Sequence, residues 1–582
     1  MCGISGILSN ERSLNKLSLV KKMSDSIIHR GPDGEGYWSN SDDNIAFGHR
    51  RLSIIDLSEN GKQPMHFCNE RFTIVFNGEI YNYIELRDFL IKHNYKFKSQ
   101  SDTEVILALY DFKGAECLSD LNGMFAFAIW DDHDKTLFCA RDRFGEKPFF
   151  YHHTPGKAFY FASEMKALWS IGIPKRIEEE KILKYLNWNF LDADNLTTTF
   201  YKDVKQLDGG HYLFIQDLSK IQQKRYYSLD SIKKNSDISE GEASSLLFNM
   251  LSDSVRLRLR SDVPVGSSLS GGLDSSTVVM LIDKIKNEEV VQNSFSARFA
   301  GYEKDEGYFI EKVVKSCSNI SNHEVWPSHE QLIDEMDKIV YYQEEPFASA
   351  SIFAQWKVME LAKKEKITVL LDGQGADEYF AGYLPYYELY IKELYYNNKS
   401  TYYSEINKYN DLRFPEVIRQ HQTIRQRLGR VRRKLLGQNV PFTKGVLKSQ
   451  LRNDTLVDGL KVLLRYADRN SMAHSREVRL PFLDHRIVEF IFSLPENFLL
   501  RNGWTKWILR QSVNDLLPQE VVWRIDKVGF EPPQGQWLKK IVTNQIRKTV
   551  QEYLKEVQLN RKKTTTIPVS DWNVYMINKM IN

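Results

Sequence analysis

Residue types that could do chemistry occur at two places far apart in this chain of 582 residues, and the first is its second residue. Cys2 follows Met1, so removal of the methionine would expose a thiol and a free α-amine on one residue. A terminal amine titrates at about 7.7–8.0 and a free thiol at about 8.5, so the amine can take the proton of the thiol near neutral pH. Taken alone, Cys2 could be a small residue that happens to follow the start; together with the second place, described next, it is predicted to be a nucleophile that carries its own base.

The second place is the segment Ser270–Ser276, which reads Ser-Gly-Gly-Leu-Asp-Ser-Ser. The short run Val263–Leu269 before it favours a strand, and Thr277–Ile282 after it favours a helix. Glycines at such a junction let backbone N–H groups approach a phosphate at the helix N-terminus, and the serine hydroxyls add donors. The segment has no P-loop lysine, so a different kind of phosphate-binding loop is predicted.

Other residues in the first part of the chain could bind and polarise a substrate. Asn77–Glu79 follows an expected strand at Phe72–Phe76, and it combines an amide side chain with an unhindered backbone N–H, the usual parts of an oxyanion hole. Arg50–Arg51 could bind a carboxylate, and Asp102 could hold an ammonium. The set would fit an α-amino acid whose far end carries the reactive carbonyl. Taken singly, these residues could instead form a hairpin turn, a surface pair and a helix cap.

The elements that must position these residues indicate two domains. The first 170 residues alternate like strands, with helical periodicity at Ile84–Ile91 and Thr103–Tyr110, and this favours layered sheets between helices. The polar stretch Lys220–Gly241 is expected to be a linker. After it, strands lead into glycine turns and helices, as at Ile367–Leu371, and this order predicts a parallel sheet with ligands at the carboxyl ends of its strands.

The composition excludes several classes of protein. The net charge is +3, so nothing in the overall charge calls for nucleic acid or an anionic membrane as partner. No run of 18 apolar residues and no signal pattern occur, and the scattered cysteines match neither a zinc site nor a disulfide framework. A cytoplasmic protein is expected. The cysteines are Cys2, Cys68, Cys117, Cys139 and Cys317.

Several motifs of the first part resemble the glutaminase domain of class II glutamine amidotransferases. They are Cys2–Ile7, His29–Gly34, His49–Ile54, Phe76–Tyr81 and Ser101–Glu104. The resemblance implies an α+β N-terminal-nucleophile fold, an αββα sandwich in which two antiparallel sheets lie between helix layers. It also implies the products glutamate and ammonia.

The same resemblance assigns roles to single residues. Cys2 would attack the side-chain amide of glutamine, and Arg51 would bind the α-carboxylate. Asp102 and Glu79 would hold the amino end, while Asn77 and Gly78 would stabilise the oxyanion.

Ser270–Ser276 resembles the pyrophosphate loop of enzymes that cleave ATP between the α and β phosphates. This implies an α/β domain of the ATP-pyrophosphatase type, like the adenine nucleotide alpha hydrolases, with Mg²⁺ held by Asp274 and Asp377. Lys527 matches a family lysine that stabilises charge as an acyl-adenylate forms. The positions that match ATP contacts are Leu269, Ser270, Gly271, Gly272, Asp274, Ser275, Ser276, Ala297, Asp372 and Gly373.

With the motif Asn470–Asp484, the resemblance to glutamine-hydrolysing asparagine synthetases covers nearly the whole chain. It implies a glutaminase domain at 1–215 and a synthetase domain at 240–582, with a helical insertion near 386–445. The family converts aspartate to an AMP ester with ATP, and ammonia that arrives through an internal channel displaces AMP. A homodimer is one assembly that the family allows.

The acceptor is the part of this expectation that the residues leave open. Asp372 and Gln374 replace the serine and glutamate of the family's Ser-Gly-Glu-Gly motif, so Gln374 occupies a catalytic position without a carboxylate. The segment Glu344–Ile352, expected near the acceptor, also departs from the family. Three hypotheses follow: asparagine synthesis, amidation of another carboxylate such as a uronic acid sugar for surface polysaccharide, and a regulatory protein that binds nucleotide and amino acid without catalysis.

Overall fold

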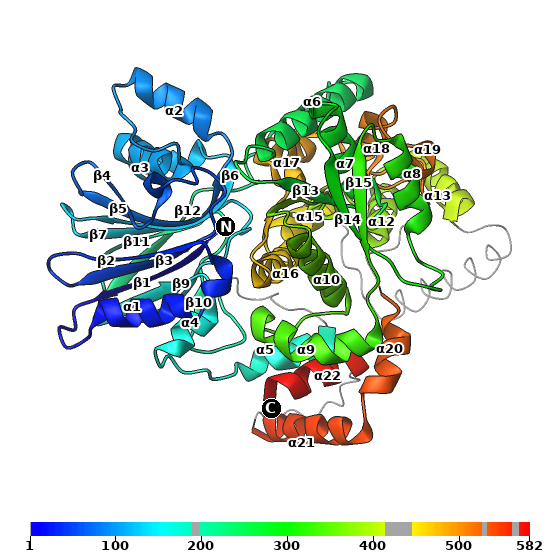
Figure 1. The fold of residues 1–582 in the computed structure, drawn as a ribbon. Coiled ribbons are helices and arrows are strands. Elements are labelled where there is room, and N and C mark those ends of the chain that lie inside the picture. The colour runs from blue at the N-terminus through cyan, green and yellow to red at the C-terminus, as the bar shows by residue number, and fades with distance from the viewer. Residues whose placement is uncertain (1, 189–196, 414–444, 526–531, 561–569, 582) are drawn as a thin grey trace.

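The chain folds into two domains that each contain β-sheet and lie side by side, as the computed structural model in Figure 1 shows. It describes residues 2–188, 197–413, 445–525, 532–560 and 570–581. The first domain holds two antiparallel sheets with the strand orders β10-β8-β9-β1-β3-β2 and β12-β11-β7-β6-β5-β4. Their bounds are β1 Gly3–Ser9, β2 Gly34–Ser39, β3 Ile45–Arg51, β4 Met65–Phe67, β5 Phe72–Ile80, β6 Gly123–Asp131, β7 Thr136–Arg141, β8 Phe150–Thr154, β9 Ala158–Ala162, β10 Lys205–Gln206, β11 His211–Asp217 and β12 Lys220–Arg225.

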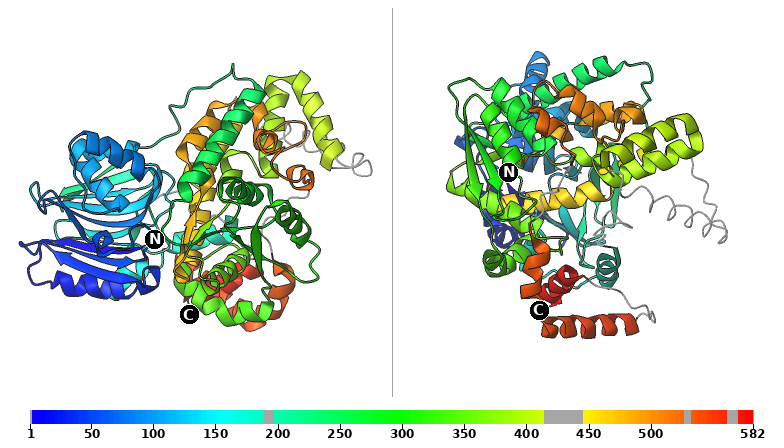
Figure 2. Two further views of the ribbon diagram at one scale, coloured as in Figure 1. Left: turned by 45° about the horizontal axis from the view of Figure 1, so that its top comes forward. Right: turned by 90° about the vertical axis from the view of Figure 1, so that its right-hand side faces the viewer.

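Alternation along the central strands explains how the two sheets stack. In β5, Ile74 and Phe76 point into the core shared with α3 (Asp102–Lys113), whereas Val75 points between the sheets. Helices α2 (Tyr83–Lys92) and α3 cover this sheet, and α1 (Lys16–Asp25) and α4 (Met165–Ser170) cover the other (Figure 2). The αββα sandwich is thereby confirmed, as are the two helices expected in this part.

Two local expectations were wrong. Asn77 and Gly78 lie inside β5, which continues to Ile80, and not after its end. The polar stretch from Lys220 begins as the edge strand β12, so the second sheet extends beyond residue 215, and only 226–239 connect it to α6 (Glu240–Arg258). An edge strand with one partner can be polar on both faces, which hides it from hydrophobic patterning.

The second domain is built on a five-stranded sheet in the order β15-β14-β13-β16-β17, with all neighbouring strands parallel. The chain order reverses between β13 and β16, and in open α/β sheets ligands bind in the crevice at such a reversal. The predicted parallel sheet is confirmed. Its strands are β13 Val265–Ser268, β14 Gln292–Ala297, β15 Ile320–Val325, β16 Val369–Leu371 and β17 Glu477–Arg479.

Helices surround this sheet, and the last helices of the chain lie beside the C-terminus (Figures 1 and 2). The insertion expected near 386–445 begins in α12 and contains α13, and its basic run Arg425–Lys434 lies outside the described residues. The helices are α5 Glu179–Trp188, α7 Leu273–Ile285, α8 Gly307–Ser316, α9 His329–Gln343, α10 Ser351–Lys364, α11 Ala376–Tyr379, α12 Leu384–Asn397, α13 Lys399–Arg413, α15 Val446–Leu456, α16 Gly459–Ala473, α17 His485–Ser493, α18 Trp507–Ser512, α19 Gln519–Val522, α20 Gln534–Ile541, α21 Asn544–Asn560 and α22 Asp571–Ile581.

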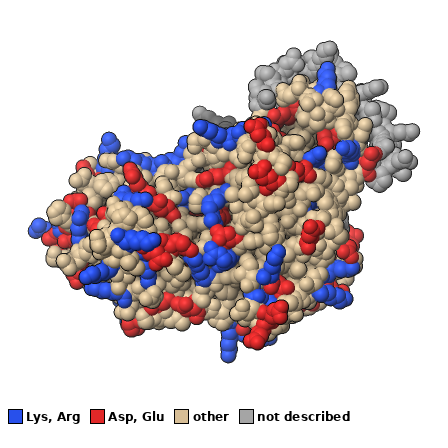
Figure 3. Space-filling model, turned by 90° about the horizontal axis from the view of Figure 1, so that it is seen from above, with Lys and Arg blue, Asp and Glu red and all other residues tan. Residues whose placement is uncertain are grey.

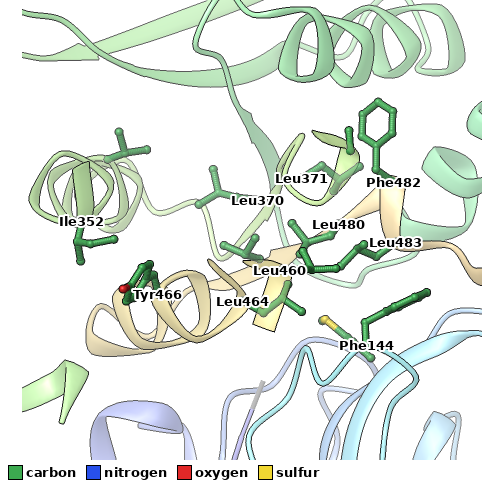
Figure 4. Close-up of a cluster of buried hydrophobic side chains, with 14 of the residues drawn as sticks. Phe144, Ile352, Leu370, Leu371, Leu460, Leu464, Tyr466, Leu480, Phe482 and Leu483 are labelled. Carbon is green, nitrogen blue, oxygen red and sulfur yellow. The ribbon is translucent and has the colours of Figure 1, made fainter. Parts of the chain in front are cut away.

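The domains share part of a hydrophobic core. Phe144 of the first domain belongs to the same buried cluster as Leu464 and Leu483 of the second, and Figure 4 shows these side chains near one another. On the face drawn in Figure 3, acidic and basic side chains are interspersed, so no field of one sign covers it. Among the described helices, none combines the length and apolarity that crossing a membrane requires.

Candidate active sites

Cys2 lies immediately before β1, at the side of the first domain that faces the second. Its backbone N–H donates to Asn77 Oδ1 (2.9 Å), and its Sγ lies 3.9 Å from the carbonyl oxygen of Leu52. Only 8% of the residue is exposed, and burial raises the pKa of the thiol. The thiol therefore needs a base to become a nucleophile near neutral pH.

Asn77 and Gly78 present donors beside this thiol. Gly78 has φ +156°, and a Cβ there would lie 2.1 Å from the carbonyl oxygen of Met124 on the paired strand β6, so only glycine fits. The Nδ2 group of Asn77 is buried and has no hydrogen-bond partner in the described part of the chain. A buried donor without a partner is costly unless a ligand uses it, as an oxyanion would.

Glu79 and Asp102 bring two carboxyl groups to the same end of β5. Asp102 Oδ2 accepts a hydrogen bond from the Ile80 N–H (2.9 Å), and burial raises the pKa of Asp102 to about 6. The pKa of Glu79 lies well above its usual range because of burial and the nearby Glu477. One oxygen of Glu79 has no hydrogen-bond partner among the described residues. A ligand ammonium would stabilise the charged form of both groups.

The structure distinguishes the two neighbouring arginines. Arg50 pairs with Asp25 and with Glu35 (2.5 Å), whereas Arg51 donates to the carbonyl oxygens of Ser58 (2.9 Å) and Asp56. Backbone carbonyls orient the guanidinium of Arg51 without neutralising its charge. Arg51 is thus the arginine of the pair that can attract a carboxylate.

The second domain completes this site with residues that sequence reasoning missed. Arg479, at the end of β17, lies with Nη2 3.5 Å from Glu79 and donates through Nε to Glu477 (2.6 Å). Both Arg479 and Glu477 are completely buried. They belong to the motif Asn470–Asp484, which was the available signal, but nothing in its spacing indicates contact with the first domain.

Arg30 ties Cys2 to the same domain. Its Nε donates to the Cys2 carbonyl oxygen (3.1 Å), and Nη1 and Nη2 donate to the carboxylate of Asp468 on α16 (2.8 and 2.9 Å). Nη1 also donates to Glu164 (2.8 Å). Arg30 is completely buried, and a buried charge is costly unless it is paired. The carboxylates of Glu164 and Asp468 provide this pairing.

The two residues after Asp468 hold the segment Glu344–Ile352. Arg469 donates to Glu344 (2.8 Å), and Asn470 donates to the carbonyl oxygen of Ile352 (3.0 Å). One turn of α16 therefore contacts both the surroundings of Cys2 and the segment expected near the acceptor.

The segment Ser270–Ser276 runs from the turn after β13 into the first turn of α7, at the predicted junction of strand and helix. Ser270 and Ser275 approach each other through their hydroxyls (3.0 Å), and Ser276 is buried in the first turn of the helix. Leu269 directly follows β13, and Ala297 is the last residue of the adjacent strand β14. The loop after β16 begins with Asp372 and Gly373. The predicted ATP-contact residues thus lie at the carboxyl ends of β13, β14 and β16, where the chain order reverses.

Asp274 and Asp377 meet at one cation, the ammonium of Lys506. Its Nζ lies 2.6 Å from Asp274 Oδ2 and 2.6 Å from Asp377 Oδ1. Two carboxylates that converge on one positive charge fit Mg²⁺, which proteins bind through one or two carboxylates together with substrate phosphates. Among the described residues, no group of three or more potential metal ligands occurs. Sequence reasoning missed Lys506, which carries no recognisable motif.

Gln374 lies two residues after Asp372, and its backbone N–H donates to the Asp372 carboxylate (3.0 Å). The side-chain oxygen of Gln374 is buried and has no hydrogen-bond partner in the described ranges. Lys527 lies outside the described residues.

Comparisons with known proteins agree with this two-site arrangement. Residues 1–227 match the model of a glutamine amidotransferase domain, and residues 247–572 match that of asparagine synthase. Asparagine synthetase [glutamine-hydrolyzing] 1 from Bacillus subtilis is 33% identical, over 95% of this chain and 90% of the relative. Asparagine synthetase [glutamine-hydrolyzing] 3 from the same organism is 30% identical, over 90% and 86%. Amidase chry2 from Gibberella zeae is 27% identical, over 92% and 90%.

The match of both domain models and the full-length relatives at 30% identity or more settle the family. The chain belongs to the glutamine-hydrolysing asparagine synthetases and is a glutamine-dependent ligase.

Proposed function

We propose that this protein hydrolyses glutamine at Cys2 and uses the released ammonia to convert aspartate to asparagine in an ATP-dependent reaction. Removal of Met1 would give Cys2 a free amine, which can take the thiol proton that burial otherwise retains. The thiolate attacks the side-chain carbonyl carbon of glutamine, Asn77 Nδ2 and the Gly78 N–H donate to the oxyanion, and ammonia leaves. Water then hydrolyses the thioester to glutamate.

Recognition of glutamine uses charges at the other end of the substrate. Arg51 pairs with the α-carboxylate, and Glu79 and Asp102 accept the α-ammonium. The contact between Arg479 and Glu79 (3.5 Å) makes the second domain part of this site. Glutamine binding and the position of β17 are therefore coupled.

In the second domain, the loop Ser270–Ser276 would bind the pyrophosphate part of ATP. The aspartate β-carboxylate attacks the α-phosphorus, a bond forms between them, and the bond to the bridging oxygen breaks so that pyrophosphate leaves. Asp274 and Asp377 would hold Mg²⁺, which neutralises phosphate charge when bound. Lys506 then contributes its ammonium to the same phosphates, and Lys527 is proposed as a further lysine at this step.

Ammonia must cross the domain interface, because it would be protonated in water. Small cavities at the interface support a route beside Asp468, which lines two of them. One cavity is lined by the apolar side chains of Leu464, Ala467, Val478 and Leu480 together with Glu146, Lys147 and Asp468. Val478 pairs with Leu370 of β16, and β16 leads into the ATP-site loop. Attack of ammonia on the β-aspartyl carbonyl would release AMP and give asparagine.

The observation that carries the proposal is the pairing of a complete Cys2 site with a complete carboxylate–lysine site across one interface. The test is to incubate the purified protein with glutamine, ATP, Mg²⁺ and a panel of carboxylic acids, and to identify the amidated product by mass. Asparagine with equal amounts of AMP and pyrophosphate is expected. The proposal is wrong if saturating aspartate gives no asparagine.

A second acceptor is favoured by one specific observation, the glutamine at position 374. An amide cannot take up a proton as a carboxylate does, so the acceptor site differs chemically from that of enzymes with glutamate there. Amidation of another carboxylate, such as a uronic acid sugar, would use the same glutaminase and ATP chemistry. A uronamide product in the panel, without asparagine, would establish this alternative.

A further inference from the structure

Lys506 reaches the two aspartates from a backbone conformation that its surroundings must impose. Its φ is +53°, in the left-handed region that non-glycine residues rarely adopt, and only 2% of the residue is exposed. Such conformations are unfavourable for a non-glycine residue and persist only where the neighbouring structure determines them. Some part of the fold must therefore hold the segment that ends at Lys506.

The segment before Lys506 is a tight turn that lies against the helical insertion. Arg501 and Trp504 exchange backbone hydrogen bonds of 3.1 and 2.8 Å around Asn502 and Gly503, which have φ +54° and +83°. The turn leaves the N–H groups of Asn502 and Gly503 directed at α12 and α13. A Cβ on Gly503 would lie 3.0 Å from the carbonyl oxygen of Lys408, so the turn fits closely against α13.

A hydrogen-bonded pair from the two helices satisfies both N–H groups. Glu405 of α13 accepts the Asn502 N–H (2.8 Å), and the Tyr387 hydroxyl of α12 accepts the Gly503 N–H (2.7 Å). The Tyr387 hydroxyl in turn donates to Glu405 (2.6 Å). Tyr387 is completely buried and Glu405 nearly so, so water cannot easily replace these bonds.

We propose that Tyr387 and Glu405 are positioning residues for Lys506, and that the base of the helical insertion thereby sets the geometry of the ATP-cleaving site. This inference rests on the proposed function, in which Lys506 acts on the phosphates of ATP. The pair touches no substrate. It fixes the turn, the turn sets the backbone of Lys506, and that backbone aims Nζ between Asp274 and Asp377.

The test compares Tyr387→Phe with a matched control, Tyr390→Phe. Tyr390 is the next tyrosine on the inner face of α12, is 5% exposed and contacts the Tyr387 ring edge-on at 5.9 Å. Its hydroxyl makes no hydrogen bond within the described residues, so the control removes a tyrosine hydroxyl from the same helix without touching the turn. Acceptor-dependent ATP–pyrophosphate exchange and glutamine hydrolysis are measured for both variants and the parent.

Tyr387→Phe is expected to lower kcat for exchange about tenfold with a much smaller change in KM for ATP, because Lys506 would act mainly on charge that develops in the transition state. Glutamine hydrolysis and the Tyr390→Phe variant should stay near the parent. Glu405→Gln keeps an acceptor oxygen for the turn and should retain more exchange activity than Glu405→Ala. Equal losses in Tyr387→Phe and Tyr390→Phe, or no loss in either, would overturn the inference.

A crystal structure of Tyr387→Phe separates this inference from the proposed function. Lys506 is expected to leave the position between Asp274 and Asp377, whatever reaction the site performs. If Lys506 stays within hydrogen-bond distance of both, the positioning role is wrong even where exchange is slow. If the parent shows no exchange with any acceptor while Lys506 moves in the variant, the proposed function fails and the positioning role stands.

Discussion

Arg30 and Asp468 form two hydrogen bonds of 2.8 and 2.9 Å across the domain interface, and both side chains are buried. Arg30 also donates to the carbonyl oxygen of Cys2 (3.1 Å). The residue proposed as nucleophile is therefore held in place by a carboxylate of the other domain. Because Arg469 next to Asp468 bonds Glu344, the same turn of α16 links the two sites.

Asp468→Asn should separate the two activities. The variant keeps the shape of the side chain but leaves Arg30 with a weaker partner, while Glu164 still neutralises part of its charge. Glutamine-dependent synthesis is expected to fall at least tenfold, since a misplacement of about 1 Å can cost about 10²-fold. Synthesis driven by ammonium should change less than about twofold. Equal losses in the two assays would show that Asp468 serves general folding and not the placement of Cys2.

Cys2→Ala should abolish glutamine hydrolysis and spare the second domain. Loss of an activated nucleophile costs on the order of 10⁶ in rate. High concentrations of ammonium salt should still support synthesis, because the second site needs ammonia and not its source. Glutamate release and amide formation are measured in parallel, and the intact mass should show that Met1 is absent from the parent. Loss of ammonium-driven synthesis in the variant would contradict the separation of the sites.

Asn77→Ala tests the oxyanion site. The unpaired Nδ2 group would be lost, and kcat for glutamine hydrolysis is expected to fall by about 10²–10³ with a smaller effect on KM. Asn77 Oδ1 also accepts the Cys2 N–H, so Asn77→Asp is the useful comparison, because it keeps an acceptor oxygen and removes the donor. The measurement is kcat and KM for glutamine hydrolysis by both variants and the parent. A variant with only KM changed would assign Asn77 to binding alone.

Asp102 predicts an acid limit for glutamine use. Burial raises its pKa to about 6, so in the free enzyme the charged form is lost as the pH falls through this value. A protonated Asp102 cannot pair with the substrate ammonium, so kcat/KM for glutamine should decrease below about pH 6. Asp102→Asn should lower kcat/KM at pH 8 and remove this limb of the profile. A limb that survives the substitution belongs to another group.

How much of the site could be predicted depended on how far apart its parts lie in the sequence. Cys2, Asn77 and Asp102 occur in short motifs whose residue types already imply their chemistry, and the structure brings them together. The contacts of Arg479 and Lys506 cross between distant segments and depend on tertiary packing. No local pattern reports such a contact. Gly78 shows the converse, because its role inside β5 was obscured by an Asn-Gly pair that is typical of turns.

Asp274→Asn tests the proposed ATP site. The substitution removes one of the two charges that face Lys506, at distances of 2.7 and 2.6 Å from the two oxygens of Asp274. It weakens any hold on Mg²⁺, because an amide offers a single neutral oxygen where the carboxylate offers two charged ones. Pyrophosphate release is expected to fall by at least about 10²-fold, and raising the Mg²⁺ concentration should recover only part of it. Glutamine hydrolysis without ATP should be unchanged, because Asp274 is not among the residues of either domain that surround Cys2. Undiminished pyrophosphate release would exclude Asp274 from the proposed metal-binding pair and leave Asp377 and Lys506 to account for binding of the phosphates.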